Sequence, residues 1–233
     1  MPGPLETALF ARLIDHAPLF PPAQLPLPEA LEDHRQARDG PHAWIVRRFV
    51  APASVLTSLD GEPLALSVVL DADVELDDPR IESVEVPPNG AVPSGGEVYV
   101  EGAIPPLPSR DTRVKVRCGP TAPSIAELAA VVHSCRAYGV PFKATAGLHN
   151  AVRQDGQHGF VNLLAAAIFG DEEAALAEDD ADAFGADGEV FRWRDRAASV
   201  ADVERGRKLF VAFGSCSFAE PVDELVALGL LTG

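Results

Sequence analysis

The sequence predicts an α/β fold, either a (β/α)8-like parallel barrel that has lost some of its helices or, as the alternative, an open doubly wound α/β sheet. Strand-like apolar segments alternate with amphipathic helical segments along much of the chain, which is typical of parallel α/β proteins. The length of 233 residues suits one such unit. We therefore expect residues 1–233 to form a single α/β domain with a helical N-terminal segment at about 1–40.

The first half of the chain contains several separate strand signals. Residues 4–16 are expected to form a helix, because apolar side chains recur there at helical spacing, and the proline-rich stretch 18–28 ends it. The run LALSVVL at 64–70 is nearly continuous in apolar residues, as in a strand covered on both faces. The other elements expected here are a helix at 28–38 and strands at 43–50, 81–86 and 97–103.

The best-defined unit is a strand, helix and strand in the middle of the chain. A strand at 113–118 is followed by a helix that begins with a capping box, in which Ser124 is the N-cap and Glu127 lies three residues on. Gly139 is suited to end that helix, and a second strand follows at 142–147. If both strands belong to one sheet, the unit is a right-handed parallel crossover.

The last third of the chain continues the alternation. We expect a strand at 190–194 to join the barrel, and an extended segment at 210–213 would supply an eighth strand. The helices expected here lie at 158–169, 171–184, 200–212 and 220–230.

Composition excludes several classes of partner. Thirty-five acidic against nineteen basic residues give a net charge of −16, which disfavours binding to nucleic acid or to anionic membranes. No apolar run reaches the roughly 18 residues of a membrane span, and the N-terminus lacks the features of a secretory signal. Three cysteines without a CxxC pair fit the reducing cytoplasm. No phosphate-binding glycine motif follows a strand, so we expect no cofactor, while association with further copies of the chain is left open.

The basic residues are sixteen arginines and only three lysines, and two of those lysines lie on the central crossover unit. Side chains alternate faces along a strand, so Lys115 shares a polar face with Arg117, and Lys143 shares one with Thr145. In a barrel beneath helices these polar faces should point inward, towards the C-terminal mouth. Buried cations there require acids or an anionic ligand.

The segment VPFKATAGLHN at 140–150 resembles the lysine-bearing strand of Schiff-base (class I) aldolases on (β/α)8 barrels, such as the deoxyribose-phosphate aldolases. The resemblance is confined to this segment. It implies that Lys143 attacks a substrate carbonyl and that Lys115 lowers the pKa of Lys143.

These observations predict a cytoplasmic enzyme that acts on a small anionic carbonyl-containing metabolite, by a reaction of the lyase, aldolase or isomerase type. The alternatives are a metal-assisted hydrolase or lyase that uses His149 or His158 with acidic ligands, and a non-catalytic domain that binds a small ligand or a protein. The expected catalytic residues are Lys143, Lys115, Asp71 and Glu101, and the expected substrate-binding residues are Arg117, Thr145, Gly147, His149, Arg192 and Arg194.

Overall fold

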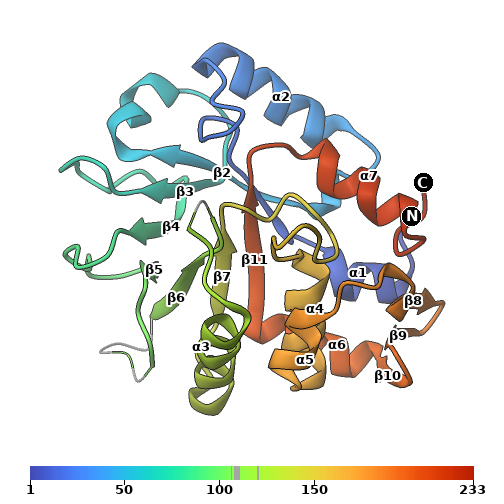
Figure 1. Ribbon diagram of the computed structural model, residues 1–233. Helices are drawn as coiled ribbons and strands as arrows, with labels where there is room; N and C mark the ends of the chain where they lie inside the picture. The colour runs from blue at the N-terminus through green and yellow to red at the C-terminus, as the bar shows by residue number, and fades with distance from the viewer. Residues whose placement is uncertain (106, 108–110, 120) are drawn as a thin grey trace.

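Eight parallel strands close into a barrel in the computed structural model, which describes residues 1–105, 107, 111–119 and 121–233. The strands β1 to β7 are adjacent in the barrel in the order in which they follow along the chain. β11 lies between β7 and β1 and closes the barrel (Figure 1). The (β/α)8-like fold is therefore confirmed. The barrel strands are β1 (Ile14–His16), β2 (Val46–Pro52), β3 (Leu66–Val69), β4 (Ile81–Val86), β5 (Glu97–Glu101), β6 (Thr112–Arg117), β7 (Phe142–Thr145) and β11 (Phe210–Ser215).

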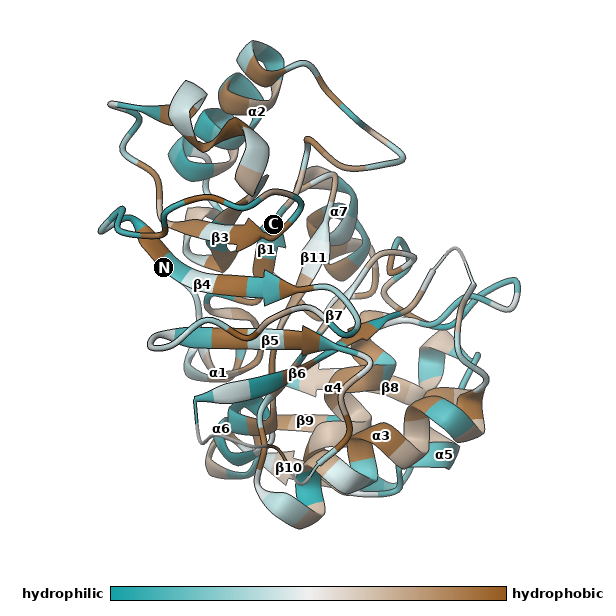
Figure 2. Cartoon of the chain, turned by 90° about the vertical axis from the view of Figure 1, so that its left-hand side faces the viewer, coloured by the Kyte–Doolittle hydropathy of each residue, from teal (hydrophilic) through white to brown (hydrophobic). Residues whose placement is uncertain are grey.

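Helices cover the barrel unevenly. Between β3 and β6 the described residues form loops rather than helices, and Figure 2 looks onto this side of the barrel. None of the helices in the described part of the chain combines the length and apolar character needed to cross a bilayer. The helices are α1 (Pro4–Phe10), α2 (Leu27–Asp39), α3 (Ile125–Tyr138), α4 (Phe160–Phe169), α5 (Glu172–Ala177), α6 (Val200–Leu209) and α7 (Ala219–Ala227), and three 3-10 turns are η1 (Ala43–Ile45), η2 (Ala53–Leu59) and η3 (Ala181–Ala183).

The central crossover forms as its sequence signals predict. The backbone N–H of Glu127 donates to the Ser124 hydroxyl at the start of α3, and the Glu127 carboxylate accepts from the Ser124 backbone in return. Gly139 ends the helix in the left-handed conformation, with φ of 63°. The strands on either side, β6 and β7, pair in parallel with Lys115 opposite Lys143.

The N-terminal helix is shorter than predicted. It ends at Phe10, and Ile14–His16 forms β1, which pairs in parallel with both β11 and β2. A three-residue strand is too short to show a periodicity of its own, and pairing on both sides determines its conformation. The helix expected at 200–212 likewise ends at Leu209, where β11 begins.

The segment at 190–194 is not a barrel strand. Val190–Trp193 is β9, the middle strand of a small antiparallel sheet with β8 (Phe184–Asp187) and β10 (Arg196–Ser199). The turns between these strands are too short for a parallel crossover, which needs a dozen or more residues. The helix expected at 171–184 is broken into α5 and η3 ahead of this sheet.

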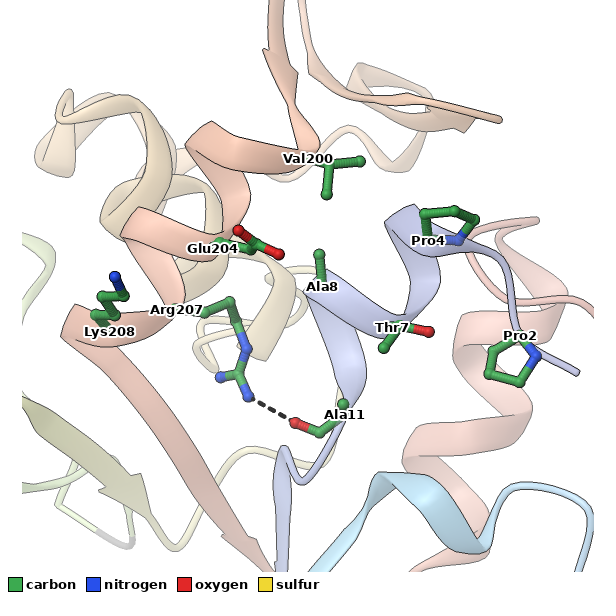
Figure 3. A pocket seen from close by; sticks show the side chains of 9 residues that line it. All are labelled: Pro2, Pro4, Thr7, Ala8, Ala11, Val200, Glu204, Arg207 and Lys208. Atoms are coloured by element: carbon green, nitrogen blue, oxygen red, sulfur yellow. Dashed lines mark hydrogen bonds between the residues drawn. The ribbon is translucent and has the colours of Figure 1, made fainter.

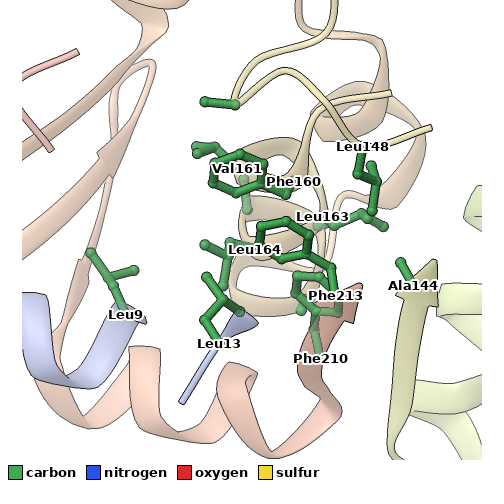
Figure 4. Packing of buried hydrophobic residues seen from close by; sticks show 14 of the residues in the cluster. Leu9, Leu13, Ala144, Leu148, Phe160, Val161, Leu163, Leu164, Phe210 and Phe213 are labelled. Atoms are coloured by element: carbon green, nitrogen blue, oxygen red, sulfur yellow. The ribbon is translucent and has the colours of Figure 1, made fainter. Parts of the chain in front are cut away.

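The main hydrophobic core lies outside the barrel wall, between the strands and the helices. Phe160 of α4 stacks on Phe213 of β11 with ring centroids 4.5 Å apart, and Leu9, Leu13 and Leu164 lie around this pair (Figure 4). Burial of each such side chain contributes about 1.5–3 kcal/mol. Several buried positions on the barrel strands are occupied instead by polar and charged side chains, among them Ser67, Glu85, Lys115 and Lys143.

Gly206 allows α6 to approach α4 closely, and Gly206→Ala tests this packing. A Cβ at this position would lie 2.8 Å from the Ile168 Cα and 2.5 Å from its Cγ1. Alanine gains up to about 1 kcal/mol over glycine in a helix, but overpacking costs about 1–3 kcal/mol. We therefore expect Gly206→Ala to lower the free energy of unfolding in urea by about 1–2 kcal/mol.

The matched control is Gly185→Ala in β8, where an added Cβ has no neighbour within 4 Å. Its free energy of unfolding should change by no more than about 0.5 kcal/mol. Equal stability of the two variants would contradict the close approach of α6 to α4.

Candidate active site

A cavity of about 650 Å³ opens at the C-terminal ends of the barrel strands, where enzymes of this architecture place their chemistry. Its volume lies within the range of roughly 300–1,000 Å³ that is usual for small-molecule sites. The segment after β1 forms an apolar wall through Phe20, Pro21 and Pro22. The polar and sulfur-bearing residues that line this mouth cavity are Glu85, Lys115, Arg117, Cys118, Thr145, His149, Gln157, Ser215 and Cys216.

Lys115 places an ammonium group at the wall of the mouth cavity. Its Nζ lies 3.0 Å from Glu85 Oε2 and 3.1 Å from Glu101 Oε2. Glu101 is the register partner of Lys115 on β5, so the two side chains face the same side of the barrel wall. The carboxylates hold Lys115 from both sides, and its side chain remains 6% exposed.

Lys143 lies beneath this level and is fully buried. Its Nζ donates to Asp15 Oδ2 at 2.5 Å and to Glu85 Oε1 at 2.6 Å. Glu85 therefore bridges the two lysines through its two oxygens. Asp15, Lys143, Glu85, Lys115 and Glu101 form a chain of alternating charges across the barrel interior, here called the charge chain.

The charge chain keeps Lys143 and Glu85 ionised. Burial alone would lower the pKa of Lys143, but Asp15 and Glu85 outweigh it and raise that pKa above its ordinary value. Burial alone would raise the pKa of Glu85, but the charges of Lys143 and Lys115 hold it well below its ordinary value. Lys143 is thus an ammonium ion without a lone pair for attack, the opposite of the lowered pKa that the aldolase resemblance implies.

Two serines fix the orientation of Glu85. Ser67 of β3 donates its hydroxyl to Glu85 Oε1 at 2.9 Å, and the Ser83 hydroxyl donates to that of Ser67 at 2.8 Å. Both serines are buried. Because the carboxylate is held by neighbours on several strands, its two oxygens are directed at two different lysines.

Four of the predicted substrate-binding residues line the mouth cavity: Arg117, Thr145, Gly147 and His149. The Arg117 side chain is 51% exposed, and its Nε donates to the Gly119 carbonyl at 2.9 Å. Gly147 is required by a close approach of the loops after β6 and β7, since a Cβ there would lie 2.6 Å from the Cys118 carbonyl oxygen. The structure thus brings these residues together with Lys115 and Glu101.

Three predicted residues lie elsewhere. Asp71 is exposed, and its carboxylate accepts from the Ser54 backbone and hydroxyl at 2.9 and 2.6 Å. Arg192 pairs with Asp187 inside the small antiparallel sheet. Arg194 follows that same strand and pairs with Glu178 at 2.5 Å. Arg192 lies on β9, which is not part of the barrel, and Arg194 lies beyond the end of that strand with a positive φ of 55°, so the two do not share a strand face.

Asp15 is the partner that sequence reasoning missed. The sequence pattern predicts that Asp15 lies at the end of a helix, whereas it lies in the middle of β1, fully buried against Lys143. The sequence offers one signal for a strand here, an acid that directly follows the apolar pair Leu13 and Ile14. Because a proline follows three residues later, the same residues also fit the end of a helix. Glu85 lies on a strand that the sequence predicts correctly, but its role as the bridge follows only from barrel closure.

A metal-assisted site receives no support from the described residues. His158 is buried, and its Nε2 lies 2.8 Å from the Pro123 carbonyl oxygen, while His149 lines the mouth cavity. In the described ranges no three histidine, cysteine or acidic side chains are grouped so as to hold a metal ion.

Comparisons with protein families, with curated proteins and with solved structures find no match to this chain. Function is therefore inferred from the geometry of the mouth cavity alone.

Lys143→Met tests whether the charge chain stabilises the fold. The substitution leaves Asp15 without its ion-pair partner and Glu85 with Lys115 only, and loss of one partner of a buried pair costs about 3–5 kcal/mol. We expect a loss of that size in the free energy of unfolding, measured in urea. Lys208→Met, on the exposed surface of α6, is the control and should change it by about 0.5 kcal/mol or less. A loss no larger than that of the control would contradict the pairing of Lys143.

Proposed function

We propose that this protein is an enzyme that acts on a small anionic carbonyl-containing metabolite by proton transfer, in a reaction of the lyase or isomerase type. One observation carries the proposal: the Lys115 ammonium lies at the wall of the mouth cavity, between the carboxylates of Glu85 and Glu101. An ammonium group in that position donates hydrogen bonds, so its role is that of an acid or an electrostatic stabiliser rather than a nucleophile.

Arg117 is the anchor for the substrate anion. Its guanidinium is half exposed at the cavity wall, and the nearest carboxylate, that of Glu101, lies 4.0 Å away. A guanidinium binds a carboxylate or phosphate through two parallel hydrogen bonds. Arg117 and Lys115 lie two residues apart on β6 and face the same side, so one small molecule spans both.

The proposed reaction removes a proton from the carbon next to the substrate carbonyl. The C–H electron pair moves into the carbonyl group, and the proton passes to the imidazole of His149, which lines the mouth cavity. Negative charge then develops on the carbonyl oxygen, where Lys115 stabilises it by donating a hydrogen bond. Return of the proton to the former carbonyl carbon, with transfer of the neighbouring hydroxyl proton to the carbonyl oxygen, completes an isomerisation. In a lyase reaction the enolate instead forms a C=C bond as a substituent on the next carbon leaves with its bonding pair and takes up the abstracted proton.

Lys143 and Asp15 act in this scheme through Glu85. Lys143 holds Glu85 as an anion, and the anionic Glu85 in turn holds the Lys115 ammonium in place. Lys143 does not line the mouth cavity, so we assign it a positioning role.

We also place the protein in the cytoplasm. All three cysteines, Cys118, Cys135 and Cys216, are free and buried. Free thiols are usual in proteins of reducing compartments.

Solvent exchange tests the proposal. Pyruvate, 2-oxobutyrate, dihydroxyacetone phosphate and glyceraldehyde 3-phosphate are incubated with the protein in D₂O, and loss of the signal of the proton next to the carbonyl is followed by ¹H NMR. We expect enzyme-dependent exchange with at least one of them, slowed about 10²–10⁴-fold by Lys115→Met. Arg117→Gln should chiefly raise the substrate concentration needed for half-maximal rate.

Arg192→Gln is the matched control, because Arg192 lies outside the barrel and should leave exchange unchanged. Absence of exchange with every compound, or equal rates for Lys115→Met and wild type, would overturn the proposal. Borohydride treatment of the same mixtures should give no covalent adduct, and an adduct on Lys115 would assign it a nucleophilic role instead.

A further inference from the structure

A group of arginines surrounds the end of the barrel opposite the mouth cavity. Arg12 precedes β1, Arg47 and Arg48 lie near the start of β2, Arg113 lies near the start of β6, and Arg207 lies on α6 just before β11. These five residues are here called the arginine cluster. In a chain with a net charge of −16, such a local excess of cations calls for an explanation.

Two carboxylates, Glu82 and Glu97, pair with four of the five arginines of the cluster. Glu97 Oε1 lies 2.9 Å from Arg47 Nη2, 3.0 Å from Arg48 Nη1 and 3.1 Å from Arg113 Nη1. Glu82 Oε2 lies 2.9 Å from Arg12 Nη2 and 3.0 Å from Arg48 Nε. Among the described residues, no other carboxylate lies within 4 Å of these guanidinium groups, so cations exceed acids by three.

Arg207 is the member of the cluster that meets only neutral oxygens in the described part of the chain. It donates to the Phe210 carbonyl at 2.7 Å and to the Ala11 carbonyl at 3.1 Å. Burial, together with the nearby charge of Arg47, lowers the pKa of Arg207 to about 9. The charged form is thus less favourable than in water, and a bound anion would relieve this cost.

A hollow of about 740 Å³ gives access to Arg207 between α1 and α6. Figure 3 shows Arg207 reaching from α6 to the Ala11 carbonyl, with Glu204 one turn earlier on the same helix and Thr7 and Ala8 on the facing helix. Lys208 is the second cation in the lining, and Glu204 is its one acidic residue, so the lining carries a net positive charge. The rest of the lining is mostly apolar, so the charged groups of Arg207, Lys208 and Glu204 determine which ligand the hollow can hold. The nearby charge of Arg47 adds to the positive potential at Arg207.

We propose that this hollow is a second binding site, distinct from the mouth cavity, for an oxyanion of the phosphate class seated against Arg207 and Lys208. A tetrahedral oxyanion accepts several hydrogen bonds at once, and guanidinium groups are its usual partners in proteins. The site does not depend on the reaction proposed for the mouth cavity. It would hold either free phosphate or the phosphoryl group of a metabolite.

Titration calorimetry and thermal melting with inorganic phosphate, at an ionic strength kept constant with NaCl, test the site. We expect saturable binding and a rise in melting temperature, with the dissociation constant raised at least about tenfold by Arg207→Gln and less by Lys208→Gln. Arg192→Gln, which lies in neither proposed site, is the control and should leave this binding intact. Glycerol 3-phosphate identifies the source, because tighter binding than that of phosphate indicates a metabolite and equal or weaker binding indicates the free ion.

Arg207 also joins α6 to α1, so Arg207→Gln can lower stability without any ligand. Lys208→Gln avoids this complication, because Lys208 is exposed. Stabilisation by phosphate no greater than that by NaCl of equal ionic strength would overturn the proposal. Wild-type phosphate affinity in both Arg207→Gln and Lys208→Gln would do so as well.

Discussion

The carboxylate of Glu85 joins two lysines inside the barrel, and the arrangement of the mouth cavity depends on it. One oxygen accepts from Lys143 and the other lies 3.0 Å from Lys115. Removing a single charge from water costs several kcal/mol, so none of these three groups would be stable at this depth without the others. Asp15 and Glu101 complete the two ends of the charge chain. The result is a fixed ammonium group at the wall of the mouth cavity.

The same electrostatic balance explains the contrast between the surface and the interior. The chain carries a net charge of −16, yet Arg48, Lys115 and Lys143 are buried on the barrel strands β2, β6 and β7. Acidic residues on the outside repel polyanions such as nucleic acids, while cations on the inside attract anions small enough to enter. Both proposed sites follow this rule, one at each end of the barrel.

The sequence predicted the part of the site that lies on well-signalled strands. Capping residues defined the helix between β6 and β7, and alternation then placed Lys115, Arg117 and Lys143 on inward faces. Asp15 could not be found in this way, because a strand of three residues has no periodicity and is defined by its two neighbours in the barrel.

The misplaced residues have a related cause. An alternating pattern looks the same in a barrel strand and in an antiparallel hairpin, so the sequence alone does not show that Arg192 lies in the small sheet. Asp71 follows a barrel strand as predicted, but its carboxylate is occupied by Ser54. The pKa of Lys143 also required three-dimensional information, because its direction depends on Asp15 and Glu85, which are distant in sequence.

The central claim is that Lys143 is a buried ammonium ion held by two carboxylates, and NMR of ¹⁵N-labelled lysine tests it most directly. With only three lysines, each Nζ signal is assigned by a single substitution. We expect the Lys143 ammonium signal to be protected from exchange with water and to persist above pH 10.5, the ordinary pKa of lysine, while exposed Lys208 exchanges rapidly. A Lys143 signal that shows a neutral amine near pH 8, or that exchanges as rapidly as that of Lys208, would contradict the claim.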